Sequence, residues 1–199
     1  VKKNVFRPPK GGIYDIGNHS KVDVAAASKQ RELLGITIDG SGGTNLPPPG
    51  HKFSDFGLPA DMLSTLEGEG FTGPMPIQAQ CIPAALSGMD IIGIAPTGTG
   101  KTLAFVLPMI VHVLHNRRKV EDNHGRKTKP RAVGLVVVPT RELASQITRD
   151  CSKYAEPFSL VVQGLFGGQS KSDQHKNLIK YGADIIVCTP GRMLDLIEM

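Results

Sequence analysis

The sequence predicts an α/β fold, in which a parallel β-sheet is flanked by helices on both faces. Short apolar or β-branched runs alternate with segments of helical periodicity along the second half of the chain. Parallel neighbours in a sheet need crossover connections, which are usually helices. Each run is followed by a turn rich in Gly, Pro or Thr. Ligands of such sheets gather beyond the carboxyl ends of the strands, so these turns are the first candidates for a functional site.

The first 50 of the 199 residues differ from the rest in composition. Pro and Gly pairs and one Pro triplet, with little apolar periodicity, predict an extended arm of low order. A short helix over Val24–Leu34 is expected within it. We therefore expect an N-terminal arm over residues 1–50 and the N-terminal part of a folded domain over residues 51–199. The chain begins with Val and stops abruptly, and is expected to be a fragment.

Periodicity and turn residues predict the remaining elements. Helices are expected from Pro59 to Gly68, over Pro76–Leu86, Thr102–His115 and Ser170–Tyr181, and from helix starts at Arg141 and near Pro190–Arg192. Strands are expected over Asp90–Ala95, Ala132–Val138, Leu160–Phe166 and Ala183–Cys188.

Charge is unevenly distributed along the chain, which has 23 Lys and Arg, 18 Asp and Glu, and a net charge of +5. Residues 1–50 carry +3 and residues 116–131 carry +5, whereas residues 51–115 carry −3 and residues 132–199 are neutral. The total charge is therefore weak evidence for nucleic-acid binding by the predicted domain. The basic stretch over residues 116–131 is interpreted either as a solvated surface loop or as a non-specific phosphate contact.

Apolar run length and cysteine spacing exclude two protein classes. The longest uncharged apolar stretch, Leu103–Val111, has nine residues, whereas a membrane-spanning helix needs ~20. The three cysteines are scattered and cannot form a disulfide framework, which suits a reducing compartment. The six histidines show no metal-ligand spacing.

A glycine-rich loop, Ala95-Pro96-Thr97-Gly98-Thr99-Gly100-Lys101-Thr102, follows a predicted strand and opens a predicted helix. Glycines let backbone N–H groups wrap a phosphate, and a helix N-terminus favours an anion. Lys101 can place its ammonium against the β- and γ-phosphates, and the Thr102 hydroxyl can ligate Mg²⁺. The generic pattern begins with Gly where this chain has Ala95, but the strand–turn–helix context supports a nucleoside triphosphate site. Lys101 and Thr102 are its candidate catalytic residues, and Thr102 is its candidate metal ligand.

Other motifs accompany this loop in a specific order. Residues Gly70–Gln78 (GFTGPMPIQ) precede it, with Phe53 another 17 residues upstream; Pro139–Ala144 (PTRELA), Gly167-Gly168 and Thr189–Arg192 (TPGR) follow it. Together they resemble the DEAD-box RNA helicases, specifically the first of that family's two RecA-like domains, a P-loop NTPase fold. The resemblance covers residues 51–199.

The resemblance implies an ATP site. Gln78 would read the adenine edge and Phe71 would stack on the base, with Phe53 as the family's isolated aromatic. Because guanine presents the opposite donor and acceptor pattern, Gln78 would select ATP. Two positions depart from the family pattern. Met75 replaces a small hydroxyl residue, and Gly73 stands where many members have a basic one.

The resemblance also implies a single-stranded RNA site formed by the other turns. Thr140 and Thr189 offer hydroxyls, Arg141 and Arg192 offer guanidinium groups for phosphate, and Gly167-Gly168 allows close backbone approach. None of these groups reads a base edge, so binding is expected to be independent of sequence. Helix capping is the alternative role for the two threonines.

The family's hydrolytic carboxylates lie in an Asp-Glu-Ala-Asp segment expected roughly 20 residues after the Thr189–Arg192 turn, and its arginine finger lies in a second domain. The resemblance implies an ATP-dependent RNA helicase in the intact protein, and we expect the 199-residue chain alone not to turn over ATP. Residues 31–40 and 183–195 look like the nuclear pre-mRNA-splicing members, although ribosome-assembly members have similar lead-ins. A monomer is expected, in the nucleus or otherwise in the cytoplasm, without membrane association and with protein partners in a ribonucleoprotein assembly.

Two other function classes remain open. A P-loop enzyme of another class, such as a small-molecule kinase or DNA translocase, would share the loop but has no need of Gln78 or the TPGR turn. A non-catalytic RNA-binding scaffold would keep the fold and would not depend on Lys101. A dinucleotide-binding fold is disfavoured because no G-x-G-x-x-G is followed by an acidic residue ~20 positions later.

Overall fold

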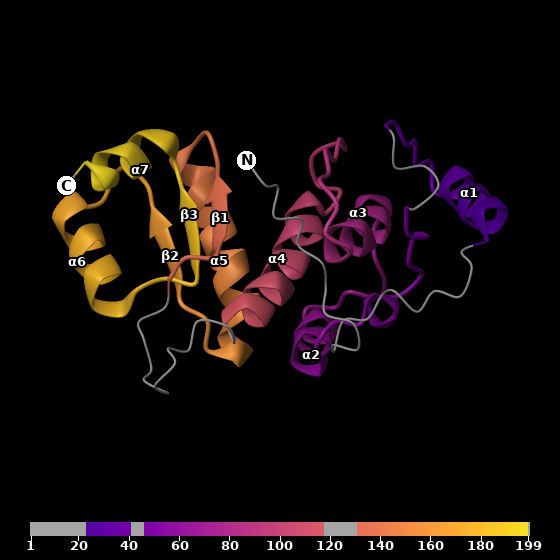
Figure 1. The fold of residues 1–199 in the computed structure, drawn as a ribbon, viewed down its shortest axis with the longest axis horizontal. Helices are drawn as coiled ribbons and strands as arrows, with labels where there is room; N and C mark the ends of the chain where they lie inside the picture. Colours follow the sequence, from indigo (N-terminus) through magenta and orange to yellow (C-terminus); the bar gives the residue numbers. More distant parts are fainter. Residues whose placement is uncertain (1–22, 41–45, 118–130, 199) are drawn as a thin grey trace, which may run out of the picture. The chain divides into compact units, whose positions relative to one another are not determined.

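The computed structural model describes residues 23–40, 46–117 and 131–198 (Figure 1). It divides into two compact units, Val1–Pro108 and Met109–Met199. Residues 1–22 of the predicted arm and residues 118–130 of the basic stretch lie outside the described residues. Among the residues that are described, no helix combines the length and apolar content needed to cross a membrane.

The described part of the first unit is helical. It contains α1 (Val24–Leu33), the 3₁₀ helix η2 (Phe53–Phe56), α2 (Ala60–Gly68), α3 (Pro76–Leu86) and the start of α4 (Lys101–Arg117). The Asp23 carboxylate caps α1 by accepting from the Ala25 and Ala26 amides at 3.0 and 3.1 Å. The core of the unit is apolar and comprises Phe53, Phe56, Leu58, Met62, Leu66, Ala79, Ile82 and Leu86. The helices predicted in this region are confirmed.

The strand predicted over Asp90–Ala95 is not formed, and that prediction was wrong. Residues 89–96 have neither helix nor strand geometry, and the side chains of Ile92 and Ile94 are 92% and 90% exposed. A strand is defined by hydrogen bonds to a neighbour, and the described residues of the first unit offer none. Gly93 is the point where this segment meets α3, since a Cβ there would lie 3.3 Å from the Ile77 side chain.

The second unit contains a three-stranded parallel sheet with the order β1-β3-β2. The strands are β1 (Gly134–Val137), β2 (Val162–Leu165) and β3 (Ile185–Cys188), and each falls within a predicted run. Ile185 at the start of β3 pairs with Gly134 on one side and Val162 on the other. All four residues of β3 are buried, as expected for the central strand of a sheet covered on both faces.

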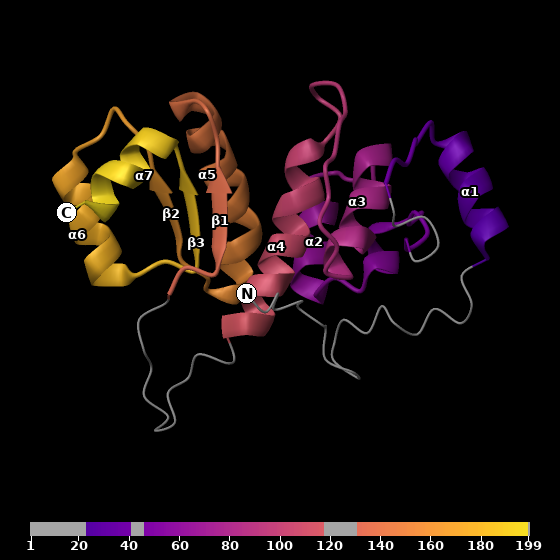
Figure 2. The same ribbon diagram turned by 45° about the horizontal axis from the view of Figure 1, so that its top comes forward.

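Helices cover both faces of this sheet, as predicted (Figures 1 and 2). The chain passes from β1 to β2 through α5 (Arg141–Ala155) and η3 (Glu156–Phe158), then returns to β3 through α6 (Lys171–Tyr181). The two crossovers run in opposite directions along the sheet, and since such crossovers are nearly always right-handed, α5 and α6 are expected on opposite faces, where Figures 1 and 2 show them. Helix α7 (Pro190–Ile197) joins α6, and its Leu196 packs with Ile186 and Cys188 in one buried cluster.

A buried carboxylate fixes the amino end of the sheet. Asp184, 1% exposed, accepts from the Val161 amide at 2.7 Å and pairs with Arg117 Nε at 3.2 Å. Because the three strands are parallel, their carboxyl ends all lie at the opposite edge of the sheet, where the predicted functional turns begin.

Candidate functional site

The glycine-rich loop lies in the first unit, between the exposed segment Asp90–Ala95 and the start of α4. Gly98 and Gly100 have φ values of +80° and +78°, a conformation that side-chain-bearing residues rarely adopt. Thr99 Oγ1 donates to the Pro96 carbonyl at 2.7 Å. The Lys101 ammonium donates to the carbonyls of Ala95 and Pro96 at 2.7 and 2.5 Å. Carbonyl groups at the start of the loop therefore bind the ammonium group of Lys101.

Accessibility differs along this loop. Pro96, Thr97 and Gly98 are exposed, whereas Thr99, Gly100, Lys101 and Thr102 are half-buried. Thr102 lies in the first turn of α4, where its hydroxyl suits an ion held mainly by phosphate oxygens. Among the described residues, no group of three or more His, Cys, Asp or Glu side chains could hold a metal by itself. The donors present thus fit Mg²⁺ held by Thr102 together with a nucleotide.

Gln78 joins the Gly70–Gln78 segment to the loop. Its side chain is completely buried, and Nε2 donates to the Gly100 carbonyl at 3.0 Å. Its Oε1 accepts from the Met75 amide at 2.9 Å, a helix-capping bond that directs the amide back over the first turn of α3. A Cβ at Gly100 would overlap Gln78 Nε2, so glycine is required there for space as well as for φ. Two residues 22 positions apart are thereby brought into contact.

The two aromatic residues predicted for the nucleotide site pack on each other. The rings of Phe53 and Phe71 lie 6.2 Å apart in an edge-to-face arrangement, and Phe56 contacts Phe53 in the same way at 6.1 Å. Phe53 is 6% exposed, whereas Phe71 is half-buried. Phe53 thus packs against Phe71, and Phe71 is the ring with more surface available to a ligand.

In the second unit, the predicted RNA-binding residues lie in the turns after the three strands. Thr140-Arg141 follows β1, Gly167-Gly168 follows β2, and Thr189 to Arg192 follows β3. The strands are parallel, so these turns share one edge. The Thr189 amide donates to the Leu165 carbonyl at 3.1 Å, which binds the last turn to the end of β2.

Arg141 lies directly against the glycine pair. A Cβ at Gly167 would be 2.8 Å from Arg141 Nε, and one at Gly168 would be 3.6 Å from Nη1. The guanidinium therefore covers the Gly167 backbone, which only glycine permits at this distance. Arg141 is otherwise exposed at the N-terminus of α5, where the helix field also favours an anion.

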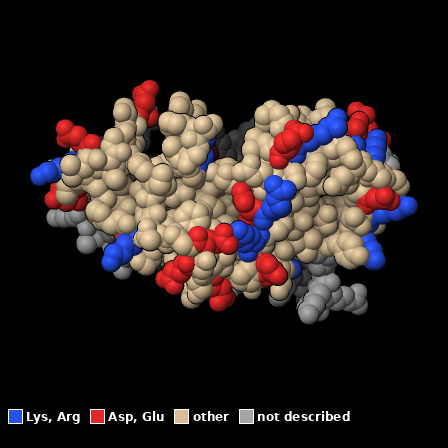
Figure 3. All heavy atoms as spheres, turned by 180° about the vertical axis from the view of Figure 1, so that it is seen from behind, with Lys and Arg blue, Asp and Glu red and all other residues tan. Residues whose placement is uncertain are grey.

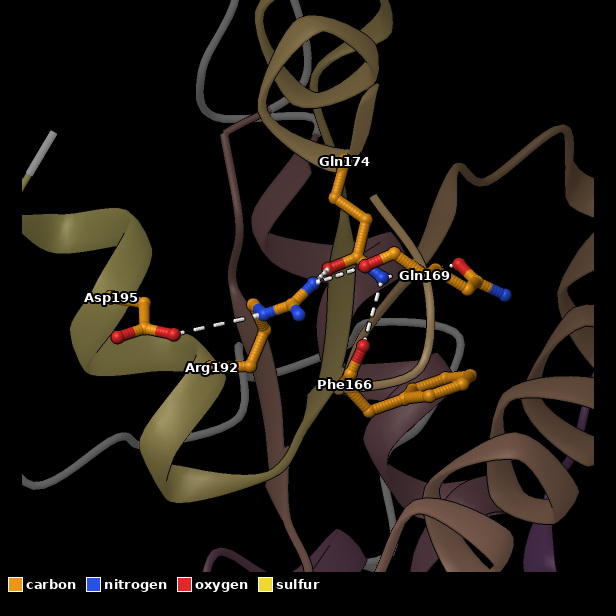
Figure 4. Close-up of polar contacts among 5 residues, drawn as sticks. All are labelled: Phe166, Gln169, Gln174, Arg192 and Asp195. Carbon is orange, nitrogen blue, oxygen red and sulfur yellow. Dashed lines mark hydrogen bonds and ion pairs between the residues drawn. The ribbon is translucent and has the colours of Figure 1, made fainter. Parts of the chain in front are cut away.

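Arg192 is held in an internal network (Figure 4). Its Nη1 donates to the Gln169 carbonyl at 3.1 Å and to Gln174 Oε1 at 2.9 Å, and Nε lies 3.9 Å from Asp195. Gln174 in turn donates to the Phe166 carbonyl at 3.0 Å. The Arg192 side chain is only 13% exposed. In this arrangement it positions the turn that contains Gly167-Gly168.

The two threonines differ in how their hydroxyls are used. Thr140 Oγ1 caps α5 by accepting from the Leu143 amide at 3.3 Å. Thr189 occupies the equivalent position before α7, but its side chain makes no capping bond. Helix capping therefore explains the contact of the Thr140 hydroxyl. Thr189 is half-buried, and its hydroxyl does not cap a helix.

Comparison with known proteins identifies the family. Residues 75–199 match the family described as DEAD/DEAH box helicase. The chain belongs to this family. It is 45% identical over 157 residues to DEAD-box ATP-dependent RNA helicase 24 of Oryza sativa subsp. japonica, covering 79% of this chain and 19% of that protein. It is 43% identical to human probable ATP-dependent RNA helicase DDX46 and 42% identical to the pre-mRNA-processing ATP-dependent RNA helicase prp5 of Aspergillus fumigatus. These two alignments cover 83% and 88% of this chain, but 15% and 14% of the relatives.

Solved structures agree with this assignment. The DEAD-box chain aligns with the RNA helicase Prp28 from Chaetomium thermophilum bound to ADP, with a TM-score of 0.72 and 35% identity over 86% of this chain and 39% of that one. Yeast Prp28, a DEAD-box splicing factor, gives a TM-score of 0.71 and 28% identity over 87% of this chain and 40% of that one. The α/β fold with a RecA-like sheet is thus confirmed, and the chain spans less than a fifth of the length of the curated relatives described above.

Sequence reasoning missed several residues that hold the candidate site residues in place. Gln169 and Gln174 hold Arg192, and the Met75 amide holds Gln78. The only signal for Met75 was its place three residues before Gln78, the spacing of a capping box. No spacing rule connects Gln174 to Arg192, which follows 18 positions later.

Charged side chains of both signs lie on the face drawn in Figure 3. Figure 3 shows Lys and Arg interspersed with Asp and Glu over a largely uncharged surface. On that face, attraction of a polyanion would depend on particular residues rather than on a broad basic field.

Proposed function

We propose that this chain is the nucleotide-binding and RNA-contacting part of an ATP-dependent RNA helicase. In this proposal, backbone amides of residues 98–102 and the Lys101 ammonium bind the phosphates, Thr102 contributes one oxygen ligand to Mg²⁺, and Gln78 and Phe71 bind adenine. The strongest support is the hydrogen bond from Gln78 Nε2 to the Gly100 carbonyl, because one ligand can then span the amide and the loop.

Gln78 carries hydrogen-bonding groups beyond those it now uses, and because its side chain is completely buried, adenine would have to displace neighbouring atoms to reach them. A side-chain amide carries two N–H donors and two acceptor lone pairs. The bonds to Gly100 and Met75 use one of each. The second N–H and lone pair match the acceptor and donor on the edge of adenine, whereas guanine presents the reverse pattern.

The RNA side of the proposal rests on Arg141 and Thr189. Arg141 is exposed and lies over the Gly167 backbone, and the Thr189 hydroxyl makes no capping bond. Both would contact the sugar–phosphate backbone of a single strand, together with Thr140, Gly168 and the helix N-termini. Arg192 would act chiefly by holding the turn. Sequence-independent binding follows, because these groups contact no base edge.

Hydrolysis and strand separation would require the intact protein, since they need a carboxylate for Mg²⁺ and water and an arginine finger. The relatives include proteins named for pre-mRNA processing and splicing, which supports a nuclear protein that works with ribonucleoprotein partners. We further propose that the protein acts as a monomer. ATP hydrolysis by the isolated chain would contradict the proposed division of labour.

Nucleotide competition tests the ATP site. Fluorescent ADP is bound to the full chain and displaced by ATP or GTP, for the unaltered protein, Lys101→Ala and Gln78→Ala. We expect Lys101→Ala to abolish binding and Gln78→Ala to reduce affinity for ATP but not for GTP. Equal affinity of the unaltered chain for both nucleotides would favour a P-loop enzyme of another class.

RNA cross-linking and RNA-stimulated ATPase activity of the intact protein test the other site. Arg141→Ala should lower both while leaving nucleotide affinity unchanged. Arg149→Ala is the matched control, because Arg149 is exposed on the same helix but lies two turns from its N-terminus. If Lys101→Ala leaves the activity of the intact protein unaltered, the chain acts as a scaffold.

A further inference from the structure

A guanidinium outside the predicted site is buried in the first unit. Arg31, in the last turn of α1, is 9% exposed. Its Nε donates to Gln80 Oε1 at 2.7 Å, and its Nη2 donates to the Pro47 carbonyl at 3.0 Å and to the Leu46 carbonyl at 3.4 Å. These acceptors are all neutral. Burial lowers the pKa of this group, so the arrangement is costly unless its directional bonds serve a purpose.

Those bonds connect α1 to α3 through the segment Leu46–Gly50. Gln80 is 5% exposed, and its Nε2 donates to the same Pro47 carbonyl at 3.0 Å. The Gly50 amide donates to the Ala79 carbonyl of α3 at 3.0 Å. Both Figure 1 and Figure 2 show α1 on the side of α3 away from α4. Helix, segment and α3 therefore form one hydrogen-bonded block.

Gln80 lies two residues after Gln78 on α3. Successive helical residues turn by about 100°, so these side chains leave the helix on nearly opposite sides. Gln78 contacts Gly100 in the loop, and Gln80 contacts Arg31 and Pro47. The first turns of α3 are thus held between the phosphate loop on one side and α1 on the other.

We propose that Arg31 is a positioning residue for adenine recognition, acting through Gln80 and the Pro47 carbonyl on the α3 turn that carries Gln78. This rests on the function proposed above. Arg31 contacts no nucleotide in this proposal. Without its bonds, α3 loses its direct connection to α1, and only the Gln80–Pro47 and Gly50–Ala79 bonds remain on that side, so the amide of Gln78 is held less firmly at its distance from the loop. Base selectivity then falls while phosphate binding persists.

Selectivity between nucleotides is the measurement that separates this role from simple support of the fold. Dissociation constants for ATP and GTP are measured on the full chain for Arg31→Ala, Arg31→Lys and Gln80→Ala. Arg31→Ala should weaken the affinity for ATP roughly 5- to 10-fold, which corresponds to about 1–1.4 kcal/mol. The affinity for GTP should change by less than about 2-fold, since it depends on the phosphates alone. Arg31→Lys keeps the charge but cannot make both bonds, so it should behave like Arg31→Ala.

Lys29→Ala is the matched control, because it removes an exposed cation from the same helix. Arg31→Ala and Gln80→Ala should not be additive, since each breaks the same connection. If the Arg31 and Gln80 variants fold and keep the ATP-to-GTP ratio of the unaltered chain while Gln78→Ala loses it, the positioning role is overturned and the proposed function stands. If the unaltered chain has no preference for ATP, both fail. If Arg31→Ala does not fold, Arg31→Lys and Gln80→Ala decide the outcome.

Discussion

Adding a methyl group at Gly100 probes the contact that joins the phosphate loop to α3. A Cβ there would overlap Gln78 Nε2 and approach Cδ to 3.1 Å. Gln78 is buried within α3 and cannot swing into solvent without disturbing the helix start. Gly98 provides the matched control, since its φ is +80° against +78° for Gly100 and nothing lies within 4 Å of its Cβ.

The two substitutions share one cost and differ in another. A side chain at positive φ costs about 1–2 kcal/mol, which applies to Gly98→Ala and Gly100→Ala alike. Gly100→Ala also breaks the Gln78 bond and leaves a buried amide N–H without its acceptor, at about 1–3 kcal/mol. We therefore expect Gly100→Ala to reduce the free energy of unfolding by about 2–5 kcal/mol, which is about 1–3 kcal/mol more than Gly98→Ala.

Urea unfolding followed by far-UV circular dichroism measures this difference, because the chain has no Trp for fluorescence. The double variant Gln78→Ala/Gly100→Ala removes the overlapping amide, so it should be less destabilised than the sum of the single changes. Equal destabilisation by Gly98→Ala and Gly100→Ala, or strict additivity with Gln78→Ala, would refute the contact.

Three further predictions concern the second unit. Gly167→Ala should displace the Arg141 guanidinium and weaken RNA binding several-fold in a filter-binding assay, with a change in stability below about 0.5 kcal/mol because the side chain can move aside. Arg192→Ala should cost about 1–3 kcal/mol in urea unfolding because the Gln169 carbonyl and Gln174 Oε1 lose their donor, whereas Asp195→Asn should cost less than about 0.5 kcal/mol. Burial and a neighbouring carboxylate raise the pKa of the Cys151 thiol from 9.0 to about 12. The free energy of unfolding should therefore fall as pH rises through that range, more steeply than in Cys151→Ala.

Each of these predictions has a contradicting outcome. Unchanged RNA affinity in Gly167→Ala would remove Arg141 from the binding surface. Equal costs at Arg192 and Asp195 would mean that the ion pair accounts for the whole cost and that the hydrogen bonds to Gln169 and Gln174 in Figure 4 contribute nothing. For Cys151, the unfolded chain loses its thiol proton near its ordinary pKa while the folded chain keeps it, so rising pH favours unfolding. Identical alkaline slopes with and without the thiol would contradict its buried state.

Local patterns were sufficient for most of the fold. Helix α3 has Pro76 at its first position and α6 has the capping residue Ser170, and both were predicted with the right extent. The parallel sheet followed from the alternation of runs and helices. The segment Asp90–Ala95 was different, because its apolar run indicates burial but pairing depends on a neighbour that sequence does not specify. Periodicity indicates which secondary structure a segment can form, but it does not indicate whether a neighbouring strand is available to pair with it.

The candidate site was predictable as a set of positions but not as a set of contacts. The order of the motifs predicted that Gln78, the glycine-rich loop and the three turns after the strands belong to the site. It implied phosphate contacts for both arginines, yet Arg192 is 13% exposed and bonded to Gln169 and Gln174, whereas Arg141 is exposed. That difference arises because α6 places a glutamine beside the turn after β3. Only the assembled sheet brings these residues together.

In the proposed ATP site, the contacts of Lys101 would separate phosphate binding from base recognition energetically. A lysine ammonium has three donors, and here two of them go to the carbonyls of Ala95 and Pro96. A triphosphate can replace these neutral acceptors, since hydrogen bonds between charged partners are roughly twice as strong. A nucleoside without phosphates cannot, so adenosine would meet a correctly placed Gln78 and a loop still closed on its lysine. The bond between Gln78 and Gly100 then becomes the connection through which phosphate binding and base recognition reinforce each other.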